Sequence, residues 1–205
     1  MPFLTTSWLS ALTAFAIGYL LGSIPFGLLF SLAFGEGDVR KIGSGSIGAT
    51  NVLRTGNRGA AALTLFFDAM KGAAAVSFMR LFMDQDAALF AALGAFLGHL
   101  FPIWLRFRGG KGVAVSLGIL LSLFWPAGLL AFATWLAVVA VYRISSLAAL
   151  VAAVMTPIYL LLFGRVHEAV LALVLAMLVF AVHSANIRRL LRGEEPRIDI
   201  KSKPA

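Results

Sequence analysis

Trp8–Phe34 reads WLSALTAFAIGYLLGSIPFGLLFSLAF and runs for 27 residues without a charged side chain. A helix perpendicular to a bilayer needs about 20 apolar residues to cross it, so this stretch is long enough to span a membrane at a tilt. It contains Gly18, Gly22, Pro25 and Gly27, which favour a kink. The sequence therefore predicts a first membrane-spanning helix that is tilted or kinked.

The composition of the whole chain supports the membrane class. Of its 205 residues 60% are hydrophobic, and the mean hydropathy is +0.94, which leaves too little polar surface for a water-soluble globule. The absence of cysteine excludes disulfides, metal–thiolate sites and thioester chemistry. The formal charge of +8 does not imply a nucleic-acid partner, because basic cytoplasmic loops produce the same excess. The first basic residue is Arg40, so the N-terminus lacks a signal peptide's charged region and we expect the first segment to remain attached.

Seven apolar segments can be drawn between polar breaks. They are Trp8–Phe34, Ala60–Met83, Ala87–Leu105, Val113–Phe124, Ala127–Tyr142, Leu147–Phe163 and Ala169–Ile187. The fourth and fifth are short and flank Trp125-Pro126, so they form either two steep spans or a re-entrant hairpin that leaves five full spans. We expect an all-α polytopic membrane protein with seven transmembrane helices, forming one domain over residues 1–205 with a basic tail at 187–205.

The basic residues predict the orientation of these helices. Of the 17 Lys and Arg residues, 14 fall in alternate loops and in the tail, where they would share one side of the membrane. They are Arg40, Lys41, Arg54, Arg58, Arg106, Arg108, Lys111, Arg143, Arg188, Arg189, Arg192, Arg197, Lys201 and Lys203. The positive-inside rule therefore places the N-terminus outside and the C-terminus in the cytoplasm.

Two glycine-rich stretches lie in these basic loops. Lys41–Asn51 reads KIGSGSIGATN, and successive N–H groups in such a turn can form a concavity that binds anions. A flexible connector is the alternative. Gly109-Gly110-Lys111-Gly112 begins a predicted helix and would form a second anion site. It is not a Walker A loop, because Leu105 stands where the first glycine would be and Gly112 follows the lysine.

Other polar residues interrupt the apolar segments at their cytoplasmic ends or within them. Asp68 and Lys71 share one helix face and form either a structural ion pair or a ligand-facing pair. His99 caps or bridges helices in the simplest interpretation. Ser146 serves as an ordinary helix cap or as part of a site. His183 and Asn186 are three residues apart, which places them on one face of a last helix. The clusters on the cytoplasmic side come from five parts of the chain, and this convergence favours a common anionic site.

With these motifs assembled, the sequence resembles the bacterial acyl-phosphate-dependent glycerol-3-phosphate acyltransferase family, the PlsY family. The resemblance covers nearly the whole chain, from the first helix to the G-x-E motif at Gly193-Glu194-Glu195 after the last one. It rests on Gly43-Ser44-Gly45, Gly48-Ala49-Thr50-Asn51, Asp68-x-x-Lys71-Gly72, Gly109-Gly110-Lys111-Gly112-Val113-Ala114, Ser145-Ser146-Leu147 and His183-x-x-Asn186-Ile187. Two positions depart from the family pattern: Ser46 stands where asparagine is usual, which leaves its role open, and Val115 stands where threonine is common.

The resemblance implies transfer of a fatty acyl group from acyl phosphate to the 1-hydroxyl of glycerol 3-phosphate, giving lysophosphatidic acid and phosphate. It implies catalytic roles for Lys111, Ser146, His183 and Asn186. It also implies substrate-binding roles for Ser44, Thr50, Asn51, Arg54, Gly110 and Gly112. It further implies seven helices with an external N-terminus, a monomer in the bacterial inner membrane among its lipids, no metal or cofactor, and a link to the enzyme that makes acyl phosphate.

The residues suit this chemistry independently. An acyl phosphate is already activated, so the protein needs positioning and positive electrostatics more than a covalent nucleophile. We expect Arg54 and Lys111 to hold the phosphates, with the hydroxyl proton passing to the donor phosphate or to His183. No histidine begins an H-x-x-x-x-D motif of the other large acyltransferase group. The alternatives are a transporter or flippase for phosphorylated anions, which would need charged or broken helices near the midplane, and a basic scaffold that binds lipid headgroups.

Overall fold

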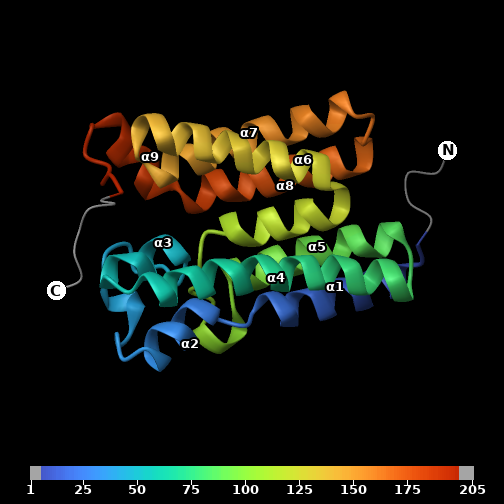
Figure 1. The fold of residues 1–205 in the computed structure, drawn as a ribbon. Coiled ribbons are helices and arrows are strands. Elements are labelled where there is room, and N and C mark those ends of the chain that lie inside the picture. The colour runs from blue at the N-terminus through green and yellow to red at the C-terminus, as the bar shows by residue number, and fades with distance from the viewer. Residues whose placement is uncertain (1–5, 199–205) are drawn as a thin grey trace. The chain divides into compact units, whose positions relative to one another are not determined.

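The computed structural model describes residues 6–198, and all regular elements in that range are helices (Figure 1). The chain divides into two compact units, one up to Leu123 and one from Phe124 onward. The helices are α1 Trp8–Gly22, α2 Phe26–Ala33, α3 Ala49–Val52, α4 Arg58–Phe82, α5 Gln85–Leu100, α6 Val113–Tyr142, α7 Ser145–Leu162, α8 Val166–Val182 and α9 Ser184–Leu191, with short 3₁₀ turns η1 Val39–Lys41, η2 Leu53–Thr55 and η3 Ile103–Leu105.

Several of these helices have the length and composition of membrane spans. Within residues 6–198, five helical stretches are long and apolar enough to cross a membrane, and α8 with α9 makes a sixth if the bent pair is one span. The all-α polytopic prediction is therefore supported. Seven spans, the orientation and the single domain stay predictions.

The first predicted helix is broken where the sequence indicated a kink. α1 ends at Gly22 and α2 begins at Phe26, and Pro25 occupies the N-cap position of α2. Proline lacks the backbone N–H that would continue α1, and its ring restricts the residue before it. The predicted kink is confirmed.

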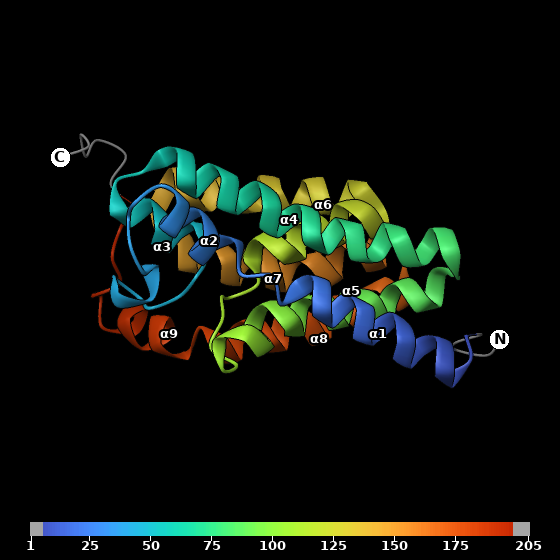
Figure 2. The same ribbon diagram turned by 90° about the horizontal axis from the view of Figure 1, so that it is seen from below.

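α1 and α5 pack against each other almost backbone to backbone (Figure 2). Glycines from both helices lie in this contact: Gly18, Gly22, Gly94 and Gly98. A Cβ atom on Gly22 would lie 2.0 Å from the carbonyl oxygen of Ala95, and one on Gly94 would lie 2.2 Å from that of Phe15. Small residues let helices approach closely in lipid, where no hydrophobic force joins them. The two glycine pairs therefore set the α1–α5 distance.

α4 is joined to α5 by a short capped turn and contacts both α5 and α1. Asn57 caps the start of α4, with its Oδ1 accepting from Ala60 N at 2.9 Å. Asp84 caps α5 in the same way, accepting from Ala87 N at 2.7 Å. These side chains satisfy backbone donors at the two helix starts.

α6 is interrupted at Phe124, whose φ of −156° and ψ of 92° are not helical. The interruption falls where the fourth predicted segment ends, immediately before Trp125-Pro126. Its two arms correspond to the fourth and fifth predicted segments.

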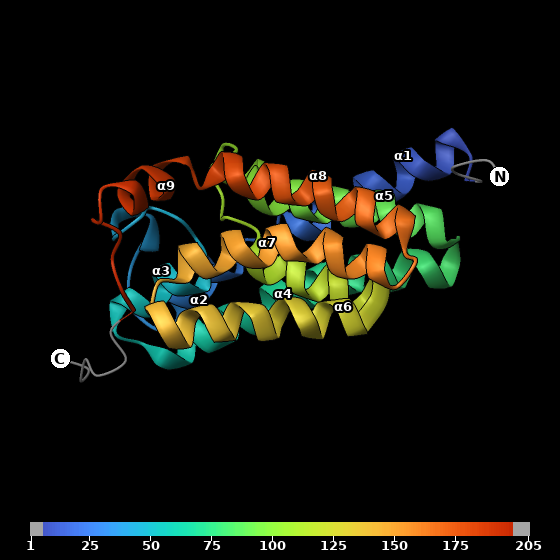
Figure 3. The ribbon, with the colours of Figure 1, turned by 90° about the horizontal axis from the view of Figure 1, so that it is seen from above.

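In the second unit, α7 and α8 lie side by side (Figure 3). The chain then bends by 65° between α8 and α9, at His183. The prediction of one continuous last helix through Ile187 is therefore wrong. His183 adopts φ −96° and ψ 8°, which ends the regular helix. Part of the predicted basic tail, including Lys201 and Lys203, lies outside the described residues.

Replacing Gly94 with alanine tests the α1–α5 contact. We expect Gly94→Ala to lower the free energy of unfolding by about 1–3 kcal/mol, because the added methyl group must push the two backbones apart. Gly59→Ala is the matched control, since its Cβ would meet nothing closer than 3.4 Å. Unfolding in detergent, followed by circular dichroism, measures both. Equal stability of the two variants would contradict the close contact.

Candidate functional site

The first glycine-rich loop is held together by the side chain of Asn51. Its Nδ2 donates to the carbonyl oxygens of Val39 at 2.9 Å, Ile42 at 3.1 Å and Ser46 at 2.8 Å. Its Oδ1 accepts from Ser44 N at 3.0 Å. Asn51 is only 3% exposed, so its amide is used by the loop itself. The predicted part of Asn51 in substrate binding can therefore only be indirect.

The loop backbone is less open to an anion than the sequence suggested. Ser44 N donates to Asn51 Oδ1, as described above. In addition, Gly45 N donates to the Ile42 carbonyl at 3.0 Å and Gly48 N donates to Ser46 Oγ at 3.2 Å. These three donors are satisfied within the loop and are not open to an anion as the sequence suggested, while an anion site elsewhere on this loop stays a prediction. Gly43 and Gly45 instead supply positive φ values of 54° and 69°, which turn the chain. Ser46, unassigned from sequence, is the acceptor in this local turn.

Three predicted binding residues present exposed side chains on this clamped loop: Ser44, Thr50 and Arg54. Arg54 lies against Gly43, where a Cβ atom would come within 2.7 Å of its Nη1. Beneath the loop lies a small apolar core of Val39, Ile47, Val52, Ala60, Ala61 and Leu105. The loop is thus anchored on its inner side and offers two hydroxyls and a guanidinium on its outer side.

The second glycine-rich turn packs directly on the end of α5. Gly109 N donates to the Leu100 carbonyl and Gly110 N to the His99 carbonyl, each at 3.0 Å. A Cβ atom on Gly110 would lie 2.0 Å from His99 Nε2. Gly112 combines a φ of 81° with contact to the Phe96 ring. Two predicted anion donors, Gly109 N and Gly110 N, are therefore already occupied. Lys111 and the helix start that follows it are the remaining features of the predicted anion site.

A buried ionic cluster lies beneath this turn. Lys71 Nζ is 2.8 Å from Asp68 Oδ1, and His99 Nδ1 is 3.6 Å from the same oxygen. Lys71 Nζ also donates to the Ile24 carbonyl at 2.8 Å. Asp68 and Lys71 are 1% and 5% exposed, so the structural ion-pair interpretation holds. His99 on α5 faces Asp68 on α4 without a hydrogen bond between them, so its bridging of helices stays a prediction, and its ring lies against Gly110.

In the second unit, Glu195 joins two of the predicted catalytic residues. Its Oε1 accepts hydrogen bonds from Ser146 Oγ at 2.7 Å and from Asn186 Nδ2, and its Oε2 accepts from Arg189 Nε at 2.7 Å. Ser146 does not cap α7, because Ile144 occupies the N-cap position. The ordinary helix-cap interpretation of Ser146 is therefore wrong.

Sequence reasoning included Glu195 in the G-x-E motif of the resemblance but gave it no role in the site. Its signal was present, since two glutamates, Glu194 and Glu195, interrupt a basic segment that follows the last helix. Burial would raise the pKa of Glu195, but the hydrogen bonds from Ser146, Asn186 and Arg189 and the charge of Arg189 together lower it. Glu195 is therefore ionised at neutral pH and acts as an acceptor only.

His183 lies at the bend between α8 and α9 and is buried. Its Nδ1 is 2.8 Å from the Val179 carbonyl oxygen, which can only accept a hydrogen bond. Nδ1 therefore carries a proton, and in the neutral ring the lone pair lies on Nε2. This leaves Nε2 as the nitrogen that can accept a proton.

Each unit thus brings together its own set of predicted residues. The first unit holds the Asn51-clamped loop and the Gly109–Gly112 turn, and the second holds Ser146, His183 and Asn186, two of them joined by Glu195. Polar donors and cations suited to anions occur in both. Among residues 6–198, no group of three or more metal-ligating side chains is found.

Comparisons with known proteins agree with one another. A family model described as Glycerol-3-phosphate acyltransferase matches residues 12–193. The protein of that name from Cereibacter sphaeroides is 55% identical over 202 residues, covering 98% of this chain and 96% of its own length. The one from Rhodopseudomonas palustris is 57% identical, with 93% and 97% covered.

Solved structures similar to this chain come from the same kind of protein. A crystal structure of PlsY, an integral membrane glycerol 3-phosphate acyltransferase, in its glycerol 3-phosphate form is 35% identical with a TM-score of 0.87, covering 93% of this chain and 96% of that one. Its lysophosphatidic acid form is 34% identical with a TM-score of 0.85 and the same coverage.

The contact of His99 with Gly110 predicts a compensating pair of substitutions. We expect Gly110→Ala to destabilise the protein, because its methyl group collides with the imidazole. His99→Ala should make room for that methyl group, so the double variant loses less stability than the sum of the singles, by about 0.5–3 kcal/mol. Unfolding in detergent measures the coupling. Gly112→Ala combined with His99→Ala is the control, because Phe96 and not His99 blocks Gly112; coupling in both pairs, or in neither, would contradict the assignment.

Glu195 predicts a pH-dependent stability. Its folded-state pKa lies below the ordinary value of 4.5, so its contribution is fully present above pH 4.5 and is lost as the pH falls through the lowered value. The stability difference between the native protein and Glu195→Gln should therefore shrink between pH 6 and about pH 3. Unfolding at several pH values measures it. The exposed neighbour Glu194→Gln is the control, and a difference that grows on acidification would refute the interpretation.

Proposed function

Because the chain belongs to the glycerol-3-phosphate acyltransferase family, we propose that it transfers a fatty acyl group from acyl phosphate to the 1-hydroxyl of sn-glycerol 3-phosphate. The products are lysophosphatidic acid and inorganic phosphate, in the first acylation of bacterial phospholipid synthesis. The observation that carries the proposal is the family match over residues 12–193, which includes every predicted site residue. The similar PlsY structures, in glycerol 3-phosphate and lysophosphatidic acid forms, support it.

Substrate binding falls mainly to side chains, because several loop N–H groups are already used. Arg54 and Lys111 hold the two phosphates and reduce the repulsion between the anionic substrates. Ser44 and Thr50 add hydroxyl donors from the exposed side of the same loop as Arg54. Asn51, Gly110 and Gly112 contribute by fixing the shape of the backbone that carries these groups.

The acyl transfer needs no enzyme-bound acyl intermediate. The 1-hydroxyl oxygen attacks the carbonyl carbon, the bond from that carbon to the phosphate oxygen breaks, and phosphate leaves with the electron pair. Lys111 stabilises the charge of the departing phosphate. Positioning and fixed positive charge of this kind each lower a barrier by several kcal/mol.

The hydroxyl proton has two acceptors available in this proposal. One is the phosphate of the donor, and the other is His183 Nε2, which carries the lone pair because Nδ1 donates to Val179. Ser146 and Asn186 orient the reacting groups. Glu195 is a positioning residue, since it holds both of those side chains by hydrogen bonds.

The distribution of basic residues supports an external N-terminus and a cytoplasmic site in the bacterial inner membrane, and we propose seven spans from the family resemblance. We propose that the protein acts there as a monomer and takes its donor from the enzyme that makes acyl phosphate. A transporter is disfavoured, because the charges in α4 that it would use, Asp68 and Lys71, are buried and paired with each other.

The identity of the acyl donor provides the direct test. Purified protein is supplied with labelled glycerol 3-phosphate and, separately, with acyl phosphate, acyl-CoA or acyl-carrier protein. We expect labelled lysophosphatidic acid from acyl phosphate alone, because acyl phosphate presents its own phosphate to the anion-binding groups proposed for the site. Movement of labelled glycerol 3-phosphate across vesicles without acylation would instead establish a transporter.

The same assay distinguishes a specific role of Lys111 in the site from a general effect of removing one positive charge. Lys111→Ala should lower kcat/KM by about 100-fold or more, because it removes the positive charge that stabilises the departing phosphate. Lys41→Ala is the matched control: it removes an exposed lysine at the end of η1 to which no binding role is assigned, and it should retain near-normal activity. A folded Lys111→Ala protein with turnover equal to the control would disprove the assignment of Lys111.

A further inference from the structure

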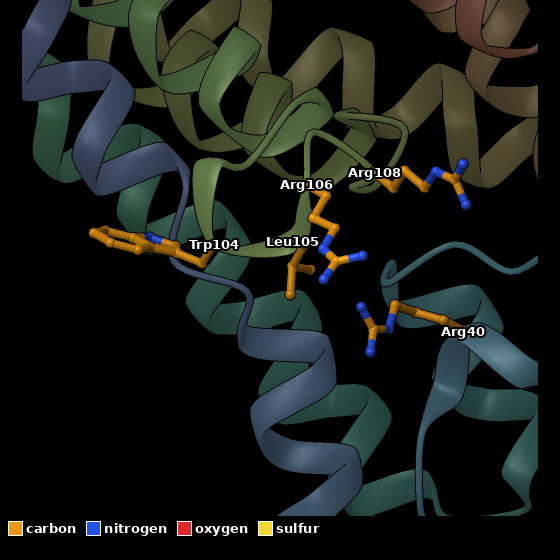
Figure 4. A pocket seen from close by; sticks show the side chains of 5 residues that line it. All are labelled: Arg40, Trp104, Leu105, Arg106 and Arg108. Atoms are coloured by element: carbon orange, nitrogen blue, oxygen red, sulfur yellow. The ribbon is translucent and has the colours of Figure 1, made fainter.

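A pocket of about 550 Å³ in the first unit is lined by three arginines that the acyl-transfer proposal does not use. Its lining residues are Arg40 from η1 and Trp104, Leu105, Arg106 and Arg108 from the loop after α5. Figure 4 shows Arg40 and Arg106 extending toward each other from opposite sides, with Leu105 nearby and Arg108 and Trp104 extending outward. The pocket thus joins two segments that are far apart in the sequence.

The charges at this pocket are only partly compensated within the protein. Arg40 is held by Asp38, with Nε 2.9 Å from Oδ1 and Nη2 2.7 Å from Oδ2. This hydrogen-bonded pair lowers the pKa of Asp38 to about 2, so the carboxylate remains ionised. Within residues 6–198, no carboxylate lies within ion-pair distance of Arg106 or Arg108, and none lines the pocket. Arg106 and Arg108 are therefore guanidinium groups without a carboxylate partner in this range, and such groups favour a bound anion.

The backbone that carries these arginines is held in an unusual conformation. Arg106 and Phe107 have positive φ values of 51° and 62°, which residues other than glycine, asparagine and aspartate rarely adopt. The turn is fixed by hydrogen bonds from Phe107 N to the Pro102 carbonyl at 3.0 Å and from Arg108 N to the Leu105 carbonyl at 3.2 Å. Such strain persists where the surrounding structure enforces it, often at binding sites.

The same loop exposes a group of large apolar side chains. Phe101, Ile103, Trp104 and Phe107 are exposed, Trp104 by 62% and Phe107 by 58%. Aromatic side chains of this kind are enriched at the membrane–water interface, and arginines beside them contact anionic headgroups. A free phosphate would bind the guanidinium groups but would not require the apolar surface around them.

We propose that this pocket binds the phosphate group of an anionic membrane lipid. The guanidinium groups of Arg40 and Arg106, which face each other, contact the phosphate oxygens, and Arg108 adds positive charge beside them. The aromatic side chains of the loop lie against the lipid. No residue assigned to acyl transfer lines the pocket, so the site is separate from the proposed reaction and does not depend on it.

Lipid titration of the detergent-purified protein tests this. Phosphatidylglycerol or phosphatidylcholine is added, and bound lipid is counted by native mass spectrometry. The pocket variant combines Arg106→Asn with Arg108→Gln, because asparagine tolerates a positive φ. We expect its affinity for phosphatidylglycerol to fall about 10-fold or more, with little change for phosphatidylcholine.

The control variant, Arg192→Gln with Arg197→Gln, removes the same charge from the C-terminal segment and should bind phosphatidylglycerol almost normally. An equal loss in both variants would show general charge attraction and overturn the proposal. A third arm adds inorganic phosphate: if the pocket variant loses phosphate binding but keeps phosphatidylglycerol binding, the pocket serves a free anion and the lipid proposal fails. Arg108→Gln alone serves as the second variant if the double variant does not fold.

Discussion

The buried ion pair of Asp68 and Lys71 is the interaction on which the first unit depends. Lys71 also donates to the Ile24 carbonyl at the break between α1 and α2, and Asp68 faces His99 on α5. The ring of His99 in turn lies against Gly110. A charge left unpaired in such surroundings destabilises a protein by about 3–5 kcal/mol. The pair therefore ties α4 to the α1–α2 break by a hydrogen bond and lies next to the imidazole on which the turn before Lys111 rests.

Glycine has a consistent role in this protein. Gly22 and Gly94 allow two helix backbones to touch, Gly110 allows a turn to rest on an imidazole, and Gly43 turns the loop below Arg54. In each case the missing side chain makes room for protein atoms. Anion recognition is left to side chains such as Arg54 and Lys111, which these close contacts hold at defined places.

Several features followed from sequence because they depend on local chemistry. Pro25 stands at the break between α1 and α2, α6 is interrupted beside Trp125-Pro126, and an Asp and a Lys three residues apart in an apolar helix pair with each other. The bend at His183 was missed because no proline or glycine marks it. The loop N–H groups were misjudged because their partners, Asn51 Oδ1 and the carbonyl oxygen of His99, are set by tertiary packing.

The role of Glu195 is likewise determined by tertiary packing and could not be read from the local sequence. Its partners Ser146 and Asn186 are 49 and 9 residues away, so no local pattern links the three. Hydrogen bonds across such separations are decided by how the helices pack. The family resemblance assigned site roles to two of these residues and included the carboxylate only as the end of its G-x-E motif, without a role.

The position of Asp68 and Lys71 on one helix also bears on how the chain enters the bilayer during synthesis. Inserting an isolated Asp or Lys at the centre of a spanning helix is unfavourable by about 2.5–3.5 kcal/mol. Because the partners are three residues apart, α4 can neutralise both charges before α5 has emerged from the ribosome. If the two charged residues lay on different helices, neither charge could be neutralised until the second helix had been synthesised. The helix can thus be released into lipid early, already carrying the charges that later organise its neighbours.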